Sequence, residues 1–142
     1  MLPQANHYMF EMIRSELSWA VGDDNVRTDD SDLLGHSIDY YWMPEMWHDR
    51  NQPPRPPDVV VTPESAEAVA KVLRIANTYK IPVTPWGGGS GSQGGALPIY
   101  GGISLDTKKL NRVIEVDEES LTITAETGCN MQQLEWATEK AG

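Results

Sequence analysis

Residues 85–95 constrain what this chain can fold into more than any other segment. The segment reads Pro-Trp-Gly-Gly-Gly-Ser-Gly-Ser-Gln-Gly-Gly, and the strand-like residues 81–84 lead into it. Because glycine has no Cβ, such a run can adopt positive φ angles and turn several backbone N–H groups toward one point. A concave row of amides binds anions, most often phosphate oxygens. The segment therefore predicts a phosphate-binding loop after a strand, with a flexible surface loop as the alternative.

The composition is typical of a globular protein with an acidic surface. The chain has 142 residues, room for one domain or part of a larger one, with 39% hydrophobic and 23% charged residues. Its net charge of −10 repels nucleic acid and anionic lipid, so we expect neither as a partner. Residues 1–50 hold ten acidic and three basic side chains. This acidic region is a solvated face or, alternatively, a docking surface for a partner protein.

The single cysteine and the lack of long apolar stretches limit the function classes further. Cys129 alone can form neither an internal disulfide nor a multi-cysteine metal site. No stretch approaches the ~20 apolar residues of a membrane span. The first 20 residues include acidic side chains and have no continuous apolar core, unlike a signal peptide. We expect a cytoplasmic protein with no membrane span and no metal site.

The N-terminal third predicts one helix followed by less regular segments. Residues 6–21 have apolar side chains near helical spacing, with Asn6 as N-cap, and 28–32 reads as an acidic loop. Residues 38–47 are rich in aromatic residues and methionine, which favours packing against an apolar surface over a dedicated binding patch. The four prolines of 50–57 predict an extended connector rather than a proline-recognition ligand. We place a domain boundary there, between 1–52 and 53–142.

The remainder alternates regularly between strand and helix signals. Residues 59–61, 81–85 and 102–106 predict strands, and Thr62 with Pro63 predicts the start of a helix that runs to Tyr79. Residues 113–116 and 121–125 alternate like a hairpin, and Asn130 is a good N-cap for a last helix over 130–140. This order predicts an α+β fold rather than a doubly wound sheet.

Several of these pieces together resemble the first half of a known domain. They are Pro-x-x-Val-Val-x-Pro at 57–63, Ala-Asn at the end of the helix, Ile-Pro-Val at 81–83, the triple glycine and Glu-x-Gly at 126–128. In this order they resemble a PCMH-type FAD-binding domain, the family of vanillyl-alcohol oxidase, p-cresol methylhydroxylase, D-lactate dehydrogenase and the glycolate oxidase FAD subunit. Asp39 also resembles an aspartate common in that position.

The resemblance implies a fold, a cofactor and its binding residues. The fold would be the first subdomain of the FAD domain, a small β-α-β unit plus antiparallel strands, incomplete in this chain. The glycine-rich turn would wrap the FAD pyrophosphate with backbone amides from Trp86, Gly87, Gly88, Gly89, Ser90, Gly91 and Gln93. Gly94 and Gly95 would let the chain approach the cofactor closely, and Pro85 would lie near its adenine or ribose. Thr127 and Gly128 would come close to the flavin.

The chain also departs from the family pattern. Many members have arginine where Trp86 stands, and some have a histidine, covalently bonded to the flavin, where Ser90 stands; the resemblance therefore implies non-covalent FAD. The family's FAD domain continues with a second glycine-rich stretch and a substrate-binding cap. The resemblance thus implies a missing C-terminal half or a second polypeptide that supplies them. Without the missing half or the second polypeptide, the sheet would expose an unpaired edge and an apolar face. We therefore expect oligomerisation or a tight partner.

The most concrete interpretation is part of an FAD-dependent oxidoreductase that acts on a small hydroxy acid, alcohol or phenol. Alternatives are a non-catalytic assembly module that docks a partner through its acidic, aromatic N-terminus, and a nucleotide-binding domain unrelated to flavin. No general base is evident. We interpret Asp106, Glu115 and Glu126 as solvated or capping carboxylates, and His7, His36 and His48 as surface or packing residues. Lys108 and Lys109 are interpreted as a basic turn, and Cys129 as a buried small side chain.

Overall fold

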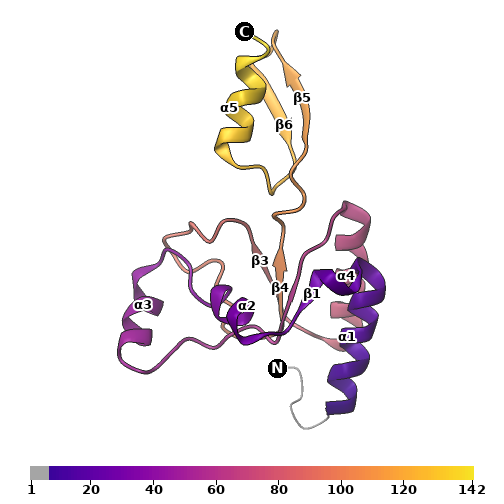
Figure 1. Ribbon diagram of the computed structural model, residues 1–142, viewed down its shortest axis with the longest axis vertical. Coiled ribbons are helices and arrows are strands. Elements are labelled where there is room, and N and C mark those ends of the chain that lie inside the picture. The colour runs from indigo at the N-terminus through magenta and orange to yellow at the C-terminus, as the bar shows by residue number, and fades with distance from the viewer. Residues whose placement is uncertain (1–6) are drawn as a thin grey trace.

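The computed structural model describes residues 7–142 and confirms an α+β architecture (Figure 1). The predicted N-cap Asn6 and the side chain of His7 lie outside the described part. The elements, in chain order, are α1 (His7–Val21), the 3-10 turn η1 (Asp23–Asn25), β1 (Val26–Arg27), α2 (Asp30–Gly35), α3 (Trp42–Asp49), β2 (Val59–Val61), α4 (Ala66–Tyr79), β3 (Val83–Trp86), β4 (Ile103–Asp106), β5 (Val113–Asp117), β6 (Thr122–Ala125) and α5 (Met131–Glu139).

The main sheet has four strands in the order β1-β2-β4-β3. Strands β2 and β3 both pair in parallel with β4, and β1 pairs antiparallel with β2. Helix α4 makes the connection from β2 to β3, so β4 enters between two strands that precede it in the chain. Because β3 and β4 are parallel, the segments that follow them leave from the same edge of the sheet. This places the glycine-rich loop beside residues 107–112.

One hydrophobic core joins both sides of the proline-rich connector. Helices α1 and α4 lie side by side on the sheet (Figure 1), with Ile13 and Leu17 packed against Val59, Val72 and Ile103. The N-terminal segment 1–52, separated from 53–142 in the sequence by a proline run, therefore contributes a helix and an edge strand to the same core. Residues 52–57 are irregular, as predicted for a connector.

The start of α4 differs from the prediction. The helix begins at Ala66 and not at Pro63, and Ser65 is its N-cap, with Oγ accepting a hydrogen bond from the Ala68 N–H at 3.1 Å. Thr62 is buried beyond β2, where its hydroxyl accepts a hydrogen bond from the Arg27 guanidinium at 2.9 Å. The N-cap assignment to Thr62 was wrong: Ser65 is the cap, and the Thr62 hydroxyl bonds a residue distant in the chain.

Two short helices replace segments predicted to be irregular. The acidic segment at 28–32 leads into α2, with Asp29 as its N-cap. Hydrogen bonds from the Ser31 hydroxyl and the Asp32 backbone lower the pKa of Asp29 to about 2. The aromatic segment forms α3, and its expected packing is only partial because Tyr40 and Trp42 are exposed. A helix of eight residues spans little more than two turns, too few to establish a period in the sequence.

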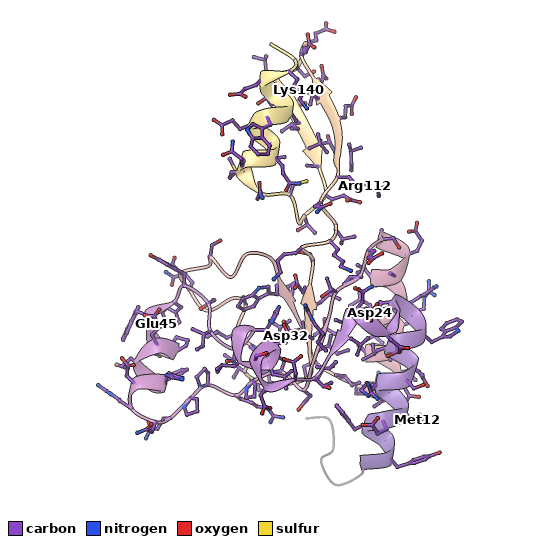
Figure 2. The ribbon with its side chains drawn as sticks, viewed as in Figure 1. Met12, Asp24, Asp32, Glu45, Arg112 and Lys140 are labelled. Carbon is purple, nitrogen blue, oxygen red and sulfur yellow. The ribbon has the colours of Figure 1, made fainter. Side chains whose placement is uncertain are left out.

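The C-terminal elements form a unit of their own beyond the end of β3 and β4 (Figure 1). Strands β5 and β6 form the predicted hairpin, and α5 packs against both. Asn130 caps α5 as predicted, in a reciprocal capping box with Gln133. Figure 2 shows Arg112 at the base of this unit, where its side chain bonds Glu126 at 2.6 and 3.0 Å. This bond and the Arg112 N–H lower the pKa of Glu126.

Among the described residues, no helix has the length and apolar character needed to cross a lipid bilayer.

Candidate functional site: a cavity beside the glycine-rich loop

A cavity of about 630 Å³ lies between the glycine-rich loop and the start of the C-terminal unit. Its walls come from three segments: the loop after β3, the turn after β4, and the turn that leads into α5. The lining residues are Gly87, Gly88, Ser90, Lys108, Asn111, Thr127, Gly128, Cys129, Asn130, Met131 and Gln133. The site therefore forms where parallel strands end, the edge at which open α/β sheets bind ligands.

The conformation of the loop depends on the indole beneath it. Gly89 has a φ of 65°, and a Cβ added there would lie 2.5 Å from the Trp86 ring. Trp86 is only 6% exposed, so its indole supports the loop from below and lies outside the cavity lining. Its carbonyl oxygen accepts hydrogen bonds from the Thr107 N–H at 2.9 Å and the Thr107 hydroxyl at 3.1 Å. These contacts tie the loop to the turn after β4.

Gly87 and Gly88 form the open face of the loop. Both line the cavity, and a Cβ added at either one meets no atom within 4 Å. Neither has a positive φ, so a side chain at either position would cause no backbone strain. It would instead fill the open space in front of the loop. An anion can approach the main chain here without meeting a side chain.

The cavity brings together some of the residues predicted from the sequence. Gly87, Gly88, Ser90, Thr127 and Gly128 line it, although the loop and the 127–128 turn are far apart in the chain. The other candidates lie elsewhere on or beside the loop, outside this lining, and their contact with a cofactor stays a prediction: Pro85, Trp86, Gly89, Gly91, Gln93, Gly94 and Gly95. Of these, Gly94 packs close to Leu97 and Tyr41.

Several lining residues escaped the sequence analysis as site residues. Lys108 and Asn111 follow β4, and Met131 and Gln133 lie in the first turn of α5. The sequence shows only that Lys108 follows a predicted strand. That this strand, β4, runs parallel to β3, the strand before the loop, is known only from the sheet order of the structure. Cys129 is half-buried in the wall.

The segment that contains Asp39 bonds the loop through its backbone. Asp39 is buried, its Oδ1 accepts the Tyr41 N–H at 3.1 Å, and the neighbouring Tyr40 N–H donates to the Gly89 carbonyl at 2.9 Å. Its Oδ2 lies 3.7 Å from where a Gly91 Cβ would stand and has no hydrogen-bond partner in the described structure. The segment before α3 thus holds the glycine-rich loop from the side opposite Thr107.

A buried carboxylate lies under the same loop. Asp106 is 1% exposed, and its Oδ2 lies 3.3 Å from His36 Nε2, 3.4 Å from an Arg27 Nη atom and 3.2 Å from Lys108 Nζ. The His36 ring in turn packs on Trp86 at a centroid distance of 4.9 Å. The interpretation of His36 as a packing residue is confirmed. Asp106 accepts the Lys108 N–H, as a capping carboxylate would, but it is not solvated. Two cations, Arg27 and Lys108, and the His36 ring converge on it only through tertiary packing.

Burial raises the pKa of Asp106, but hydrogen bonds from His36 and from the Lys108 backbone and side chain outweigh burial and leave the pKa below its ordinary value of 3.8. A depressed folded-state pKa means that the ionised carboxylate stabilises the fold at neutral pH. That stabilisation is present above the unfolded-state pKa and is lost as the pH falls through the folded-state value.

We expect Asp106→Asn to lower the free energy of unfolding at pH 7 by roughly 2–4 kcal/mol, because the buried cluster loses the carboxylate that Arg27, His36 and Lys108 share. Urea unfolding of the intact protein measures this. The difference from wild type should shrink as the pH falls below about 4. Asp24→Asn, at an exposed aspartate on η1, is the control and should change little. An Asp106 variant as stable as wild type at pH 7 would contradict the assignment.

Comparison with known families identifies the fold that carries this cavity. The family model described as "FAD binding domain" matches residues 57–142. The chain belongs to this family.

Relatives of the FAD-binding chain are longer proteins. Identity is 36% over 80 residues with the probable mitochondrial D-lactate dehydrogenase of Danio rerio, covering 56% of this chain and 16% of that protein. It is 34% over 86 residues with the glycolate oxidase subunit GlcD of Bacillus subtilis (strain 168), covering 61% and 18%. A solved alkyldihydroxyacetonephosphate synthase superposes with a TM-score of 0.84 at 25% identity, covering 93% of this chain and 25% of that one. The chain thus spans at most about a quarter of these proteins.

The residues of the cavity fit FAD. Its diphosphate is an anion, and the cavity offers glycine backbone with open space before it, the N-terminus of α5 and the ammonium of Lys108. Within residues 7–142, no three or more His, Cys, Asp or Glu side chains are grouped so that they could hold a metal ion. The glycine backbone, the helix N-terminus and the lysine ammonium together suit a phosphate-bearing organic cofactor.

Proposed function

We propose that this chain is the diphosphate-binding part of an FAD-dependent oxidoreductase. The observation that carries the proposal is the cavity whose opposite walls are the glycine-rich loop and the turn into α5. Backbone amides at Gly87, Gly88 and Ser90 would hold the diphosphate on one side. Thr127 and Gly128 would border it on the other. The remaining loop residues shape the turn, with Trp86 below it and Asp39 beside it.

The cofactor would be held without a covalent bond to a histidine. Within the described residues, no histidine lines the cavity: His36 is buried under Trp86, and His48 is exposed on α3. Bound FAD supplies hydride acceptance, while the protein binds the cofactor, orients it and excludes competing reactions. The chain's own contribution is to fix the diphosphate against a loop anchored by Thr107 and Tyr40.

We infer that the substrate is a 2-hydroxy acid. Similar proteins are named for D-lactate, glycolate and D-2-hydroxyglutarate, each of which has a hydroxyl beside a carboxylate. The structurally similar 4-ethylphenol oxidase from Gulosibacter chungangensis keeps phenols as the second candidate class. Groups that bind the substrate would come from outside this chain.

We further infer that additional polypeptide covers the C-terminal unit. The unit leaves large apolar side chains exposed on β5, in the hairpin turn and on α5, at Ile114, Leu121, Met131 and Trp136. Such a surface is typical of an interface. Either the rest of the same protein or a second polypeptide would extend the two-stranded sheet of this unit and complete the cofactor site.

The intact protein should be yellow, with flavin absorbance near ~450 nm that bleaches when a 2-hydroxy acid is added without oxygen. D-lactate, glycolate and 4-ethylphenol are the test substrates, added separately under argon. Bleaching by the phenol alone would reject the hydroxy-acid class. A protein that stays colourless both alone and with a co-purified partner would reject the oxidoreductase and favour an assembly module.

A further inference from the structure

Lys108 is the one cationic side chain among the residues that line the cavity of the described structure. Its position is notable because the whole chain carries a net charge of −10, which opposes the approach of a diphosphate. Glycine amides contribute only partial charges, so a full positive charge at the same wall would add a much stronger attraction. Lys108 is the residue placed to supply it.

The geometry keeps this ammonium near the loop but leaves it accessible. Its Nζ lies 3.2 Å from the buried Asp106 Oδ2, and its side chain remains 57% exposed. Asp106 keeps other partners if this ammonium turns away, because His36 Nε2 and an Arg27 Nη atom also lie within 3.4 Å of the same oxygen. A lysine stem is flexible, so the ammonium can turn from the carboxylate to an anion in the cavity while Asp106 stays paired.

The next lysine has a different environment and defines the contrast. Lys109 Nζ lies 2.7 Å from Glu64 Oε1 and 2.7 Å from Asn25 Oδ1, on the side of α4 and η1. It does not line the cavity. Two adjacent lysines of the same turn therefore have different partners, and only Lys108 lines the cavity.

We propose that Lys108 is a cofactor-binding residue that donates a charge-assisted hydrogen bond to the diphosphate of FAD. This inference rests on the proposed function, because it assumes that the cavity holds FAD. It adds a side-chain cation to a site otherwise built from main-chain amides. It also explains how a strongly acidic chain retains an anionic cofactor.

The test is the FAD dissociation constant of the intact apoprotein, measured by fluorescence quenching, for wild type and three variants. Lys108→Gln should weaken FAD binding about tenfold or more, and Lys108→Arg should restore most of the affinity. Lys109→Gln, the matched control, should bind FAD within about twofold of wild type. Because a direct ionic contact is screened by salt, wild-type affinity should fall more steeply between low and high ionic strength than that of Lys108→Gln.

Each outcome decides the question. Equal affinity of Lys108→Gln and wild type, an equal loss in Lys109→Gln, or an unchanged salt dependence would overturn the role of Lys108. A purely structural role in pairing with Asp106 would lower the unfolding temperature of the apoprotein without changing the salt dependence. A wild-type protein that binds no FAD at all would instead reject the proposed function, whatever the variants do.

Discussion

Gly88→Val is expected to abolish FAD retention while leaving the fold intact. Gly88 lines the cavity, its φ is not positive, and an added Cβ meets no atom within 4 Å. The valine side chain would therefore project into space that a diphosphate needs, and its β-branch leaves it little freedom to turn aside. We expect FAD affinity to fall on the order of 100-fold, about 2.7 kcal/mol of binding free energy.

Two measurements separate this steric effect from unfolding. The flavin-to-protein ratio after purification reports retention, and thermal unfolding of the apoprotein reports the fold. Gly35→Val is the matched control, because Gly35 ends α2, also has no atom within 4 Å of an added Cβ, and does not line the cavity. An unchanged flavin content in Gly88→Val would show that the diphosphate does not bind at this face of the loop.

Gly128→Ala should have the largest effect on the fold. A Cβ at Gly128 would collide with the carbonyl oxygen of Thr107, lie 2.8 Å from that of Leu110 and 3.0 Å from the Lys108 carbonyl carbon. All three are main-chain atoms of the turn after β4, which cannot move as a flexible side chain would. The Gly128 N–H also donates to the Leu110 carbonyl at 2.7 Å. We expect a loss of about 3 kcal/mol or more in the free energy of unfolding.

The same substitution should also disturb the cofactor site. The 127–129 turn and residues 107–110 form one close contact between the main sheet and the C-terminal unit, and both line the cavity. Urea unfolding and FAD affinity of the intact protein should both decline, whereas Gly35→Ala should leave both near wild type. If Gly128→Ala proves as stable as wild type and keeps its FAD, the close packing seen at this turn is not present in solution.

Local sequence was enough to predict the regular half of the fold. Val59–Val61 is a run of β-branched residues that reads as a buried strand, and it forms β2 with every residue buried. Asn130 and Gln133 satisfy each other's backbone and side-chain groups within one helical turn, so the start of α5 is visible without tertiary contacts. The glycine-rich loop was also predictable, because glycine adopts the positive φ found at Gly89 and Gly94 without the steric cost that a Cβ brings.

Other elements depend on partners distant in the chain. Strand β1 has two residues and exists only because Val26 and Arg27 pair with β2. Thr62 bonds Arg27, 35 residues earlier in the chain, and α4 begins after Ser65 instead. The cluster gathers residues 27, 36 and 108 around the Asp106 carboxylate, and no spacing in the sequence predicts such a grouping.

For the site, the sequence alone determined that a side-chain-free turn follows a strand, because that property belongs to the glycines themselves. The tertiary structure decided what faces this turn. Parallel pairing of β3 with β4 puts Lys108 at the same edge, and the close contact of Gly128 with residues 107–110 brings the N-terminus of α5 opposite the loop. A cavity is a property of surfaces that meet, and which surfaces meet is set by sheet order and packing rather than by neighbouring residues.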